Sequence, residues 1–351
     1  MKRTFCILMS LAMILTLFAG CGKTEAPAET PAAPAAPAET VDSGATAQEP
    51  VVTLRLAHCN PEGDPTDLEA KKFAELVGEY SGGKVAVEIY PNAILGDWTE
   101  LLEGLSTGIC DIMIEGYGDL EGYSIMGALD AVPFVYNSYD HFMNVWYGEV
   151  GDAFQQKTLE DSGIRIFGAA YRGARIVTST KSFTNADELA DLGLKIRVPA
   201  LNMYTRTWEY LETNTTPISL NEVLTCLQQG TVEAQENPCI MSYNYGFYDV
   251  CDYLVKTNHV YSATTFMIDD DLYSSYDADI QEAIFKAAEE SGPWVSEYIR
   301  DIEGEYFAKW EEEGCTVIDP DRESFAAKLD GMVEAEFPEL MEYVEMIKEA
   351  A

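Results

Sequence analysis

Three short apolar runs decide the fold of this chain: TLRLAH (Thr53–His58), VAVEIY (Val85–Tyr90) and DIMIE (Asp111–Glu115). The stretch 67–80, between the first two runs, repeats its apolar residues every three or four positions, and a second such stretch begins at Asp97. This alternation of strand and helix predicts an α/β fold with a largely parallel sheet and helices on its faces. Ligands of such sheets bind beyond the carboxyl ends of the strands, where His58 and Glu115 fall.

The second half of the sequence repeats the alternation. The elements expected there are strands at 165–171, 175–179 and 195–199 and helices at 203–211 and 220–230. Helical spacing then continues from Asp277 to Glu313, which is long enough to reach across two lobes. Because Gly292-Pro293 lies inside this stretch, we expect a kink or a break there.

Residues 1–20 have the layout of a secretory signal peptide, with two basic residues and an apolar run from Phe5 to Phe18. Such a run extends about 21 Å as a helix, which is too short to cross a hydrocarbon core of about 30 Å. The small residues before Cys21 resemble a bacterial lipobox, so we expect Cys21 to be lipidated and to anchor the protein to the membrane. Residues 21–50 contain too few bulky apolar side chains to build a core and are expected to form a flexible linker.

The charge of the chain excludes one class of partner. With 22 basic and 60 acidic side chains, the formal net charge is −38, which argues against binding to nucleic acid. The same charge repels a free anionic ligand. A site that binds an anion must therefore be locally positive, so single arginine residues indicate where such a site lies.

Six cysteines remain after Cys6 in the leader and Cys21 are set aside: Cys59, Cys110, Cys226, Cys239, Cys251 and Cys315. No CxxC motif occurs among them. An exported protein could pair them, but a domain of this size needs no disulfide, so structural thiols are slightly favoured.

Motifs of catalysis are weak in this sequence. Gly104–Gly108 matches G-x-S-x-G, but a helix precedes Ser106 and a strand follows it, which reverses the order that a nucleophile elbow requires. The loop Gly116–Gly122 has its third glycine one place too late for a dinucleotide fingerprint. We therefore expect no catalysis, although a surface hydrolase stays open as a remote alternative.

No metal or cofactor is expected either. The three histidines, His58, His141 and His259, lie far apart and lack the spacing of a zinc site. The acidic run 269–271 could bind a hard cation, but a solvated turn is the more probable interpretation in so acidic a chain.

The most informative residue is Arg197, which interrupts the apolar run LKIRVP (194–199). If this strand is buried, its guanidinium needs a partner, because an unpaired buried charge costs several kcal/mol. A ligand carboxylate suits the planar fork of arginine. An internal ion pair with one of the many acids is the alternative, and the sequence leaves both open.

A set of motifs around this arginine carries a resemblance to a known family: Tyr90-Pro91 with Leu95-Gly96, LKIRVP (194–199), LQQG (227–230), QENP (235–238), and Phe247-Tyr248 leading to Thr257-Asn258-His259. In this order the motifs resemble the solute-binding proteins of tripartite ATP-independent periplasmic (TRAP) transporters, the DctP-like family. The resemblance covers nearly all of 51–351.

The resemblance implies a two-lobed periplasmic-binding-protein-like fold of type II, with a long helix that spans both lobes. The expected lobe I comprises 51–172 and 263–302, and the expected lobe II comprises 173–262 and 303–351. The lobes close over the solute.

The resemblance also implies roles for single residues. Arg197 is expected to bind the solute carboxylate, with Arg175 and Asn237 as supporting contacts. Glu115 matches an acid that meets polar groups of the solute in some members, and Leu220 aligns with the pocket wall. Two further ligand-binding candidates, Tyr117 and His58, come from their positions at strand ends.

The expected function is that of an extracytoplasmic solute-binding lipoprotein. It would capture a small organic acid, such as a dicarboxylate, a sugar acid or an aromatic acid, and deliver it to integral membrane permease subunits. The alternatives are a binding protein of an ATP-driven importer, a surface sensor with the same lobes, or the remote hydrolase.

Overall fold

The computed structural model describes residues 50–351, which belong to one compact unit. The signal peptide, Cys21 and nearly all of the linker lie outside the described residues. No helix of the described part is long and apolar enough to cross a membrane.

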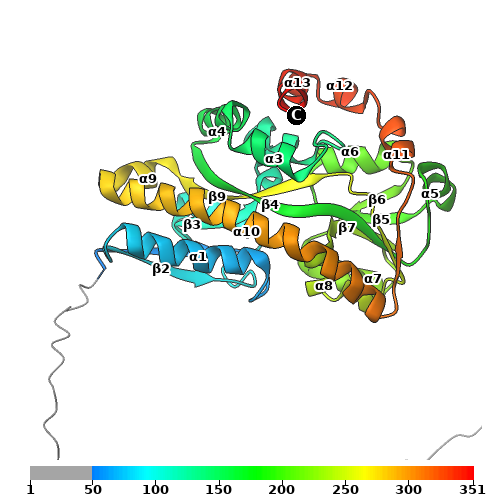
Figure 1. Cartoon of the computed structure of the whole chain (residues 1–351), viewed down its shortest axis with the longest axis horizontal. Helices are drawn as coiled ribbons and strands as arrows, with labels where there is room; N and C mark the ends of the chain where they lie inside the picture. Colours follow the sequence, from blue (N-terminus) through cyan, green and yellow to red (C-terminus); the bar gives the residue numbers. More distant parts are fainter. Residues whose placement is uncertain (1–49) are drawn as a thin grey trace, which may run out of the picture. The chain divides into compact units, whose positions relative to one another are not determined.

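Ten strands form one mixed sheet (Figure 1). The strands are β1 (Val52–Ala57), β2 (Val85–Tyr90), β3 (Ile112–Gly116), β4 (Ile164–Ser179), β5 (Lys195–Val198), β6 (Asn214–Pro217), β7 (Ala234–Pro238), β8 (Tyr253–Val255), β9 (Tyr261–Asp269) and β10 (Thr316–Ile318). Their order is β2-β1-β3-β9-β4-β7-β5-β6, with β8 between β4 and β10. On the division expected from the resemblance, β1, β2, β3 and most of β9 fall in lobe I, β5 to β8 and β10 fall in lobe II, and β4 runs through both.

Thirteen α-helices surround this sheet within residues 50–351. They are α1 (Pro65–Tyr80), α2 (Trp98–Thr107), α3 (Tyr139–Trp146), α4 (Glu149–Ser162), α5 (Ala186–Leu192), α6 (Asn202–Tyr210), α7 (Val223–Gln228), α8 (Cys239–Asn244), α9 (Asp270–Ser275), α10 (Ala278–Glu312), α11 (Arg322–Lys328), α12 (Met332–Glu336) and α13 (Met341–Glu349). Short 3₁₀ turns occur at η1 (Tyr117–Gly122), η2 (Ile125–Ala131), η3 (Leu220–Glu222), η4 (Phe247–Asp249) and η5 (Pro338–Leu340).

The alternation expected at the start of the fold is confirmed. β1 pairs in parallel with β2 on one side and with β3 on the other. Local signals explain the helix starts, because Asp64 caps α1 ahead of a proline and Asp97 forms a capping box with Glu100 at α2. The sheet is less parallel than predicted, since β4 and β9 pair antiparallel to each other and to their neighbours β3, β7 and β8.

The strands predicted at 165–171 and 175–179 are one strand of 16 residues, β4. It pairs with β9 in lobe I and then with β7 in lobe II, and its register with β9 shifts twice on the way. Gly168 (φ 63°) and Gly173 (φ 102°) adopt the backbone conformations that these irregularities require. In the sequence, a β-bulge has the same pattern as the end of a strand, which explains why two strands were predicted instead of one.

Helix α10 stabilises the irregular part of β4, along which it runs in Figure 1. Three backbone amides of β4, those of residues 168, 171 and 174, donate to side chains of α10. The acceptors are Glu289 (2.9 Å), Ser296 (2.8 Å) and Glu303 (3.2 Å), which are spaced seven residues apart and so lie on one face. The long helix therefore braces both lobes, as expected from the resemblance.

Of the kink or break expected at Gly292-Pro293, the break does not occur, since α10 is continuous from Ala278 to Glu312 with Pro293 inside it. Gly292 instead permits close packing. A Cβ atom at this position would lie 2.7 Å from the carbonyl oxygen of Ala169 and 2.7 Å from the hydroxyl of Tyr147. The glycine is therefore a contact site between helix and strand.

The last helix, α13, contacts residues from the range expected for the other lobe. Helix α13 falls in the range assigned to lobe II, yet it packs against α4 of lobe I. The ring nitrogen Nε2 of His141 in α3 lies 2.7 Å from the carbonyl oxygen of Ile347 in α13. Figure 1 shows α13 above α3 and α4, which agrees with these contacts.

Candidate functional site

A cavity lies between the lobes and encloses about 610 Å³ of empty space, part of which is open to solvent. Residues from the ranges expected for lobe I and for lobe II both line it. The lobe I wall consists of Cys59, Asp97, Trp98, Glu115, Gly116, Gly118, Asp119, Asp130 and Arg172. The lobe II wall consists of Arg175, Arg197, Pro199, Leu201, Tyr204, Ser219, Leu220, Asn221, Asn237 and Met241.

Arg197 stands on β5, the strand between β7 and β6, and its side chain is only 3% exposed. Its Nε donates to the carbonyl oxygen of Ile218 at 2.8 Å, and within residues 50–351 it makes no ion pair. Burial lowers the pKa of Arg197 to about 10; Glu236 opposes this shift, and the charge of Arg175 adds to it. The guanidinium is therefore a buried cation that lacks a carboxylate partner in the described part of the chain.

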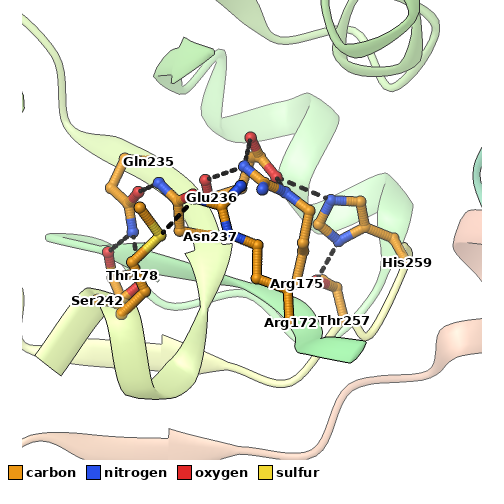
Figure 2. A network of polar contacts seen from close by, with 10 residues as sticks. Arg172, Arg175, Thr178, Gln235, Glu236, Asn237, Ser242, Thr257 and His259 are labelled. Carbon is orange, nitrogen blue, oxygen red and sulfur yellow. Dashed lines mark hydrogen bonds and ion pairs between the residues drawn. The ribbon is translucent and has the colours of Figure 1, made fainter. Parts of the chain in front are cut away.

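Arg175 has a partner of its own, which the sequence did not reveal. Figure 2 shows the guanidinium facing Glu236, with Nε 2.5 Å from one carboxylate oxygen and Nη2 2.7 Å from the other. Tyr204 stacks on the guanidinium at 4.7 Å. Nε2 of His259 lies 3.3 Å from the same carboxylate, and its other ring nitrogen forms a hydrogen bond with the hydroxyl group of Thr257. Burial would raise the pKa of Glu236, but Arg175 and His259 lower it below its usual value.

Asn237 belongs to a chain of buried amide and hydroxyl groups (Figure 2). Its Nδ2 donates to Oε1 of Gln235 at 2.7 Å, and Nε2 of Gln235 donates to Thr178 at 2.7 Å and to Ser242 at 3.2 Å. These bonds fix the orientation of the Asn237 amide at the cavity wall. The QENP motif thus contributes a cavity residue, Asn237, and the counter-ion of Arg175, Glu236.

The lobe I wall is organised around Glu115 and Arg172, two residues from different strands. The backbone amide of Cys59 donates to Oε1 of Glu115 at 2.6 Å, and Nη2 of Arg172 lies 4.0 Å from Oε2. Nη2 of Arg172 also approaches the sulfur of Met241 at 3.8 Å, and its Nε is buried without a partner among the described residues. A Cβ atom at Gly116 would lie 2.9 Å from Nη1, so a larger residue there would displace this guanidinium.

Two further acids of this wall, Asp119 and Asp130, carry raised pKa values. Burial, together with the nearby charge of Glu115, raises the pKa of Asp119 to about 8, although Arg172 acts against the shift. Burial likewise raises the pKa of Asp130 to about 7, even though one of its oxygens accepts the backbone amide of Ala263 at 2.6 Å. Asp119 has no hydrogen-bond partner among the residues that the structure describes.

Several hydrogen bonds join the expected lobes, among them the following. Nδ2 of Asn244 donates to Asp64 at 2.9 Å, and the hydroxyl of Tyr245 donates to the carbonyl oxygen of Cys59 at 3.3 Å. The first backbone amide of α6 donates to Glu121 at 3.0 Å. These contacts hold the two walls close together.

Five of the seven expected ligand-binding residues line the cavity, namely Arg197, Arg175, Asn237, Glu115 and Leu220. The other two do not. Tyr117 is fully buried in the core, where its hydroxyl bonds to Thr158 at 2.7 Å and its ring packs against Trp146. The ring of His58 is also fully buried, with Nε2 3.6 Å from Asp67, and burial lowers its pKa.

Arg172, Asp119 and Asp130 were missed by the sequence analysis. Strand alternation places residues 172 and 175 on opposite faces of a strand, but the bulge between them brings both side chains to the cavity. Asp119 lies in the glycine-rich loop after β3, where an acid four residues beyond Glu115 was the available signal.

The remaining motifs show no arrangement for catalysis or metal binding. The hydroxyl of Ser106 donates to the carbonyl oxygen of Glu103 at the end of α2. Asp269 caps α9. Across residues 50–351 no group of three or more His, Cys, Asp or Glu side chains could hold a metal ion, and the six cysteines are free thiols.

Comparison with known proteins gives the family. The family model for "Bacterial extracellular solute-binding protein, family 7" (DctP) matches residues 56–339. A solute-binding protein of Roseobacter denitrificans is 32% identical over 290 residues, which cover 83% of this chain and 88% of the relative. The 2,3-diketo-L-gulonate-binding periplasmic protein of Escherichia coli is 28% identical and covers 80% and 85%, respectively.

A solved structure agrees with these sequence matches. The crystal structure of the Roseobacter denitrificans TRAP solute-binding protein, with bound L-galactonate, superposes with a TM-score of 0.80 at 30% identity, over 86% of this chain and 99% of that one. Proteins of this family bind solutes for transporters and are not enzymes. The chain therefore belongs to family 7 of the bacterial extracellular solute-binding proteins, the DctP-like, carboxylate-binding receptors of TRAP transporters.

Proposed function

We propose that the protein captures a small hydroxylated organic acid outside the cytoplasmic membrane, holds its carboxylate at Arg197 and passes it to separate TRAP permease subunits. The observation that carries this proposal is the state of Arg197. It is a buried cation in the cavity with one backbone acceptor and no acidic partner in the described chain. A bound carboxylate supplies the missing charge and two acceptor oxygens.

The neighbouring groups suit the rest of such a solute. Glu236 neutralises the charge of Arg175. Arg175 therefore contributes to the shape and the electrostatic potential of the cavity and needs no second anionic group from the ligand. The amide of Asn237 and the backbone around Leu220 border the Arg197 side. On the opposite wall, carboxyl oxygens can accept hydrogen bonds from hydroxyl groups. The related proteins that bind L-galactonate and 2,3-diketo-L-gulonate support a ligand of the sugar-acid type rather than a simple dicarboxylate.

A thermal-shift screen of the purified protein against sugar acids, hydroxy acids and C4 dicarboxylates tests this proposal. A ligand that binds the folded state raises the melting temperature by mass action. We expect hits among hydroxylated carboxylates and none among the matching neutral sugars. If neutral sugars stabilised the protein as well as the acids do, the carboxylate would have no role.

We further propose that Cys21 is acylated and anchors the protein to the membrane surface. Its support is the sequence at the end of the apolar leader. The test is fractionation of cells that express the wild-type protein or Cys21→Ser. Acylation predicts that only the wild-type protein stays with the membrane fraction, and equal release of both would contradict it.

A further inference from the structure

We infer that Arg172 and Glu115 together bind one hydroxyl group of the solute, which lies between the guanidinium and the carboxylate and forms a hydrogen bond with each. The inference deepens the proposed function and rests on it, because it takes an acid held at Arg197 as its starting point. It adds a second point of recognition in the same cavity, and it gives a solute-binding role to Arg172, which no motif of the sequence indicated.

The separation of the two groups sets the size of what fits between them. Nη2 of Arg172 lies 4.0 Å from Oε2 of Glu115. This distance is too long for a direct hydrogen bond, whose heavy atoms lie about 2.7 to 3.2 Å apart. One oxygen atom at about 2.8 Å from each group spans the gap with an angle of roughly 90° at that oxygen. A polar separation of this length is typical of a contact that a hydroxyl group or a water molecule bridges.

The two sides of the gap differ in hydrogen-bonding capacity. A guanidinium only donates, and an ionised carboxylate only accepts. A hydroxyl group does both at one oxygen, so it can accept from Arg172 and donate to Glu115. A keto oxygen would leave the carboxylate unpaired, and a methylene group would leave both sides unpaired. The gap therefore selects for a hydroxyl group at one position of the solute.

Arg172 has donors that the described chain does not use. Its side chain is 14% exposed, and its Nε is buried without a partner among the described residues. Its one hydrogen bond within residues 50–351 joins Nη2 to the thioether sulfur of Met241 at 3.8 Å. Unpaired donors on a nearly buried guanidinium are unfavourable. A solute oxygen in the cavity supplies the acceptor.

The other acids near Arg172 do not take this place. Burial raises the pKa of Asp119 to about 8 and that of Asp130 to about 7, so Asp119 is mostly uncharged and Asp130 partly uncharged at neutral pH. Glu69 lines a second, smaller cavity together with Arg172, and burial holds its pKa well above the usual value. The contact with Glu115 at 4.0 Å is the only ion pair of Arg172 within residues 50–351.

The fold holds both sides of the gap in place. The backbone amide of Cys59 donates to the other oxygen of Glu115 at 2.6 Å, which fixes the carboxylate. The bulge at Gly173 brings Arg172 to the cavity, and Gly116 leaves room for it, since a Cβ atom there would lie 2.9 Å from Nη1. A gap that is formed before the solute arrives favours affinity, because few groups must be ordered on binding.

The test compares an acid with forms of it that lack one hydroxyl group. The probe is the tightest binder among L-galactonate, L-gulonate, D-erythronate, D-galacturonate and D-glucuronate, together with its monodeoxy derivatives. In calorimetry with the wild type, loss of one particular hydroxyl should weaken binding about tenfold or more. In Arg172→Met the same loss should weaken binding less than about twofold, because the bond is already absent. The other hydroxyl groups should give equal factors in the two proteins.

Two further variants make the comparison specific. Glu115→Gln keeps an acceptor for the amide of Cys59 but replaces the oxygen that faces Arg172 or its partner with a donor, so the same deoxy effect should fall to about threefold or less. Arg165→Met carries the same substitution on the same strand, where Arg165 pairs with Asp270 outside the cavity, and should keep the full effect. The melting temperature of ligand-free Arg172→Met should stay constant or rise, since the unused donors do not stabilise the free protein.

The outcomes separate the inference from the proposed function. If every deoxy form loses the same factor in the wild type and in Arg172→Met, a water molecule keeps the gap in the complex and the inference is overturned. A full deoxy effect in Glu115→Gln, or a fall of about 5 °C or more in the melting temperature of Arg172→Met with unchanged affinity, overturns it as well. In these cases the proposed function stands. If none of the five acids binds, or if binding does not depend on Arg197, the proposed function fails and the inference fails with it.

Discussion

Replacement of Arg197 by methionine should weaken ligand binding strongly and yet leave the free protein at least as stable. The methionine side chain preserves much of the apolar stem and removes the charge. In the free protein, the pKa of Arg197 falls from 12.5 to about 10, mainly through burial. At about 1.4 kcal/mol per pKa unit, this shift corresponds to roughly 3 kcal/mol of unfavourable free energy for the charged form.

A ligand carboxylate that pairs with Arg197 recovers this free energy and adds a charge-assisted hydrogen bond. We therefore expect Arg197→Met to weaken binding by about 3 to 5 kcal/mol, which is more than a hundredfold in the dissociation constant. Calorimetry with the strongest acid found by thermal shift measures this loss. Arg300→Met, in which an exposed arginine is changed, is the control and should bind normally.

The melting temperature of the ligand-free variant separates binding from folding. Removal of an uncompensated buried charge should keep this temperature constant or raise it by about 2 °C or more. Binding within threefold of the wild type would refute the role of Arg197. A large loss of stability in the free variant would show that Arg197 serves the fold and that an internal partner forms in solution.

Three other variants test the surroundings of the site. Glu236→Gln leaves the charge of Arg175 buried without its counter-ion and should destabilise the protein by about 3 to 5 kcal/mol in urea unfolding; a loss below 1 kcal/mol would contradict the pairing. Gly292→Ala forces α10 away from β4 and should lower the free energy of unfolding by about 1 to 3 kcal/mol. Gly304→Ala in the same helix has open space at its Cβ position and should raise the free energy of unfolding by about 0.5 to 1 kcal/mol. Asn244→Ala removes the hydrogen bond to Asp64 and should raise the ligand dissociation rate, measured by stopped flow, about threefold to tenfold. The melting temperature of the free protein should not change. An unchanged dissociation rate would show that this bond plays no part in closure.

The sequence predicted most of lobe I because its signals are local. Asp64 ahead of a proline and the capping box of Asp97 with Glu100 mark the starts of α1 and α2 within one turn. The strands beside these helices, β1 and β2, are short and mostly apolar. Such information is available from a short window of residues, so the expected and observed elements nearly coincide.

The structure of β4 depends on contacts that no short window contains. Its bulges are stable because Glu289, Ser296 and Glu303 accept backbone amides that the neighbouring strand leaves free. These acceptors lie at least 121 residues further along the chain. Sequence patterns near Gly168 and Gly173 therefore suggested two strands.

The same limit explains which site residues were found. Arg197 and Asn237 stand in motifs that carry the family resemblance, and the cavity contains both. Tyr117 was chosen because it follows a strand end, but proximity along the chain does not fix side-chain direction, and its ring turns into the core. Arg172 reaches the cavity only through the bulge beside Gly173, which the period of a regular strand does not predict.

The state of Arg197 connects ligand capture to the fold. Its charge is buried without a carboxylate partner in the described part of the chain, so the free protein holds this charge at a cost that a bound carboxylate removes. A neutral sugar leaves the guanidinium unpaired, whereas an organic acid pairs with it. We therefore expect the affinity of the site to depend on the charge of the solute as much as on its shape.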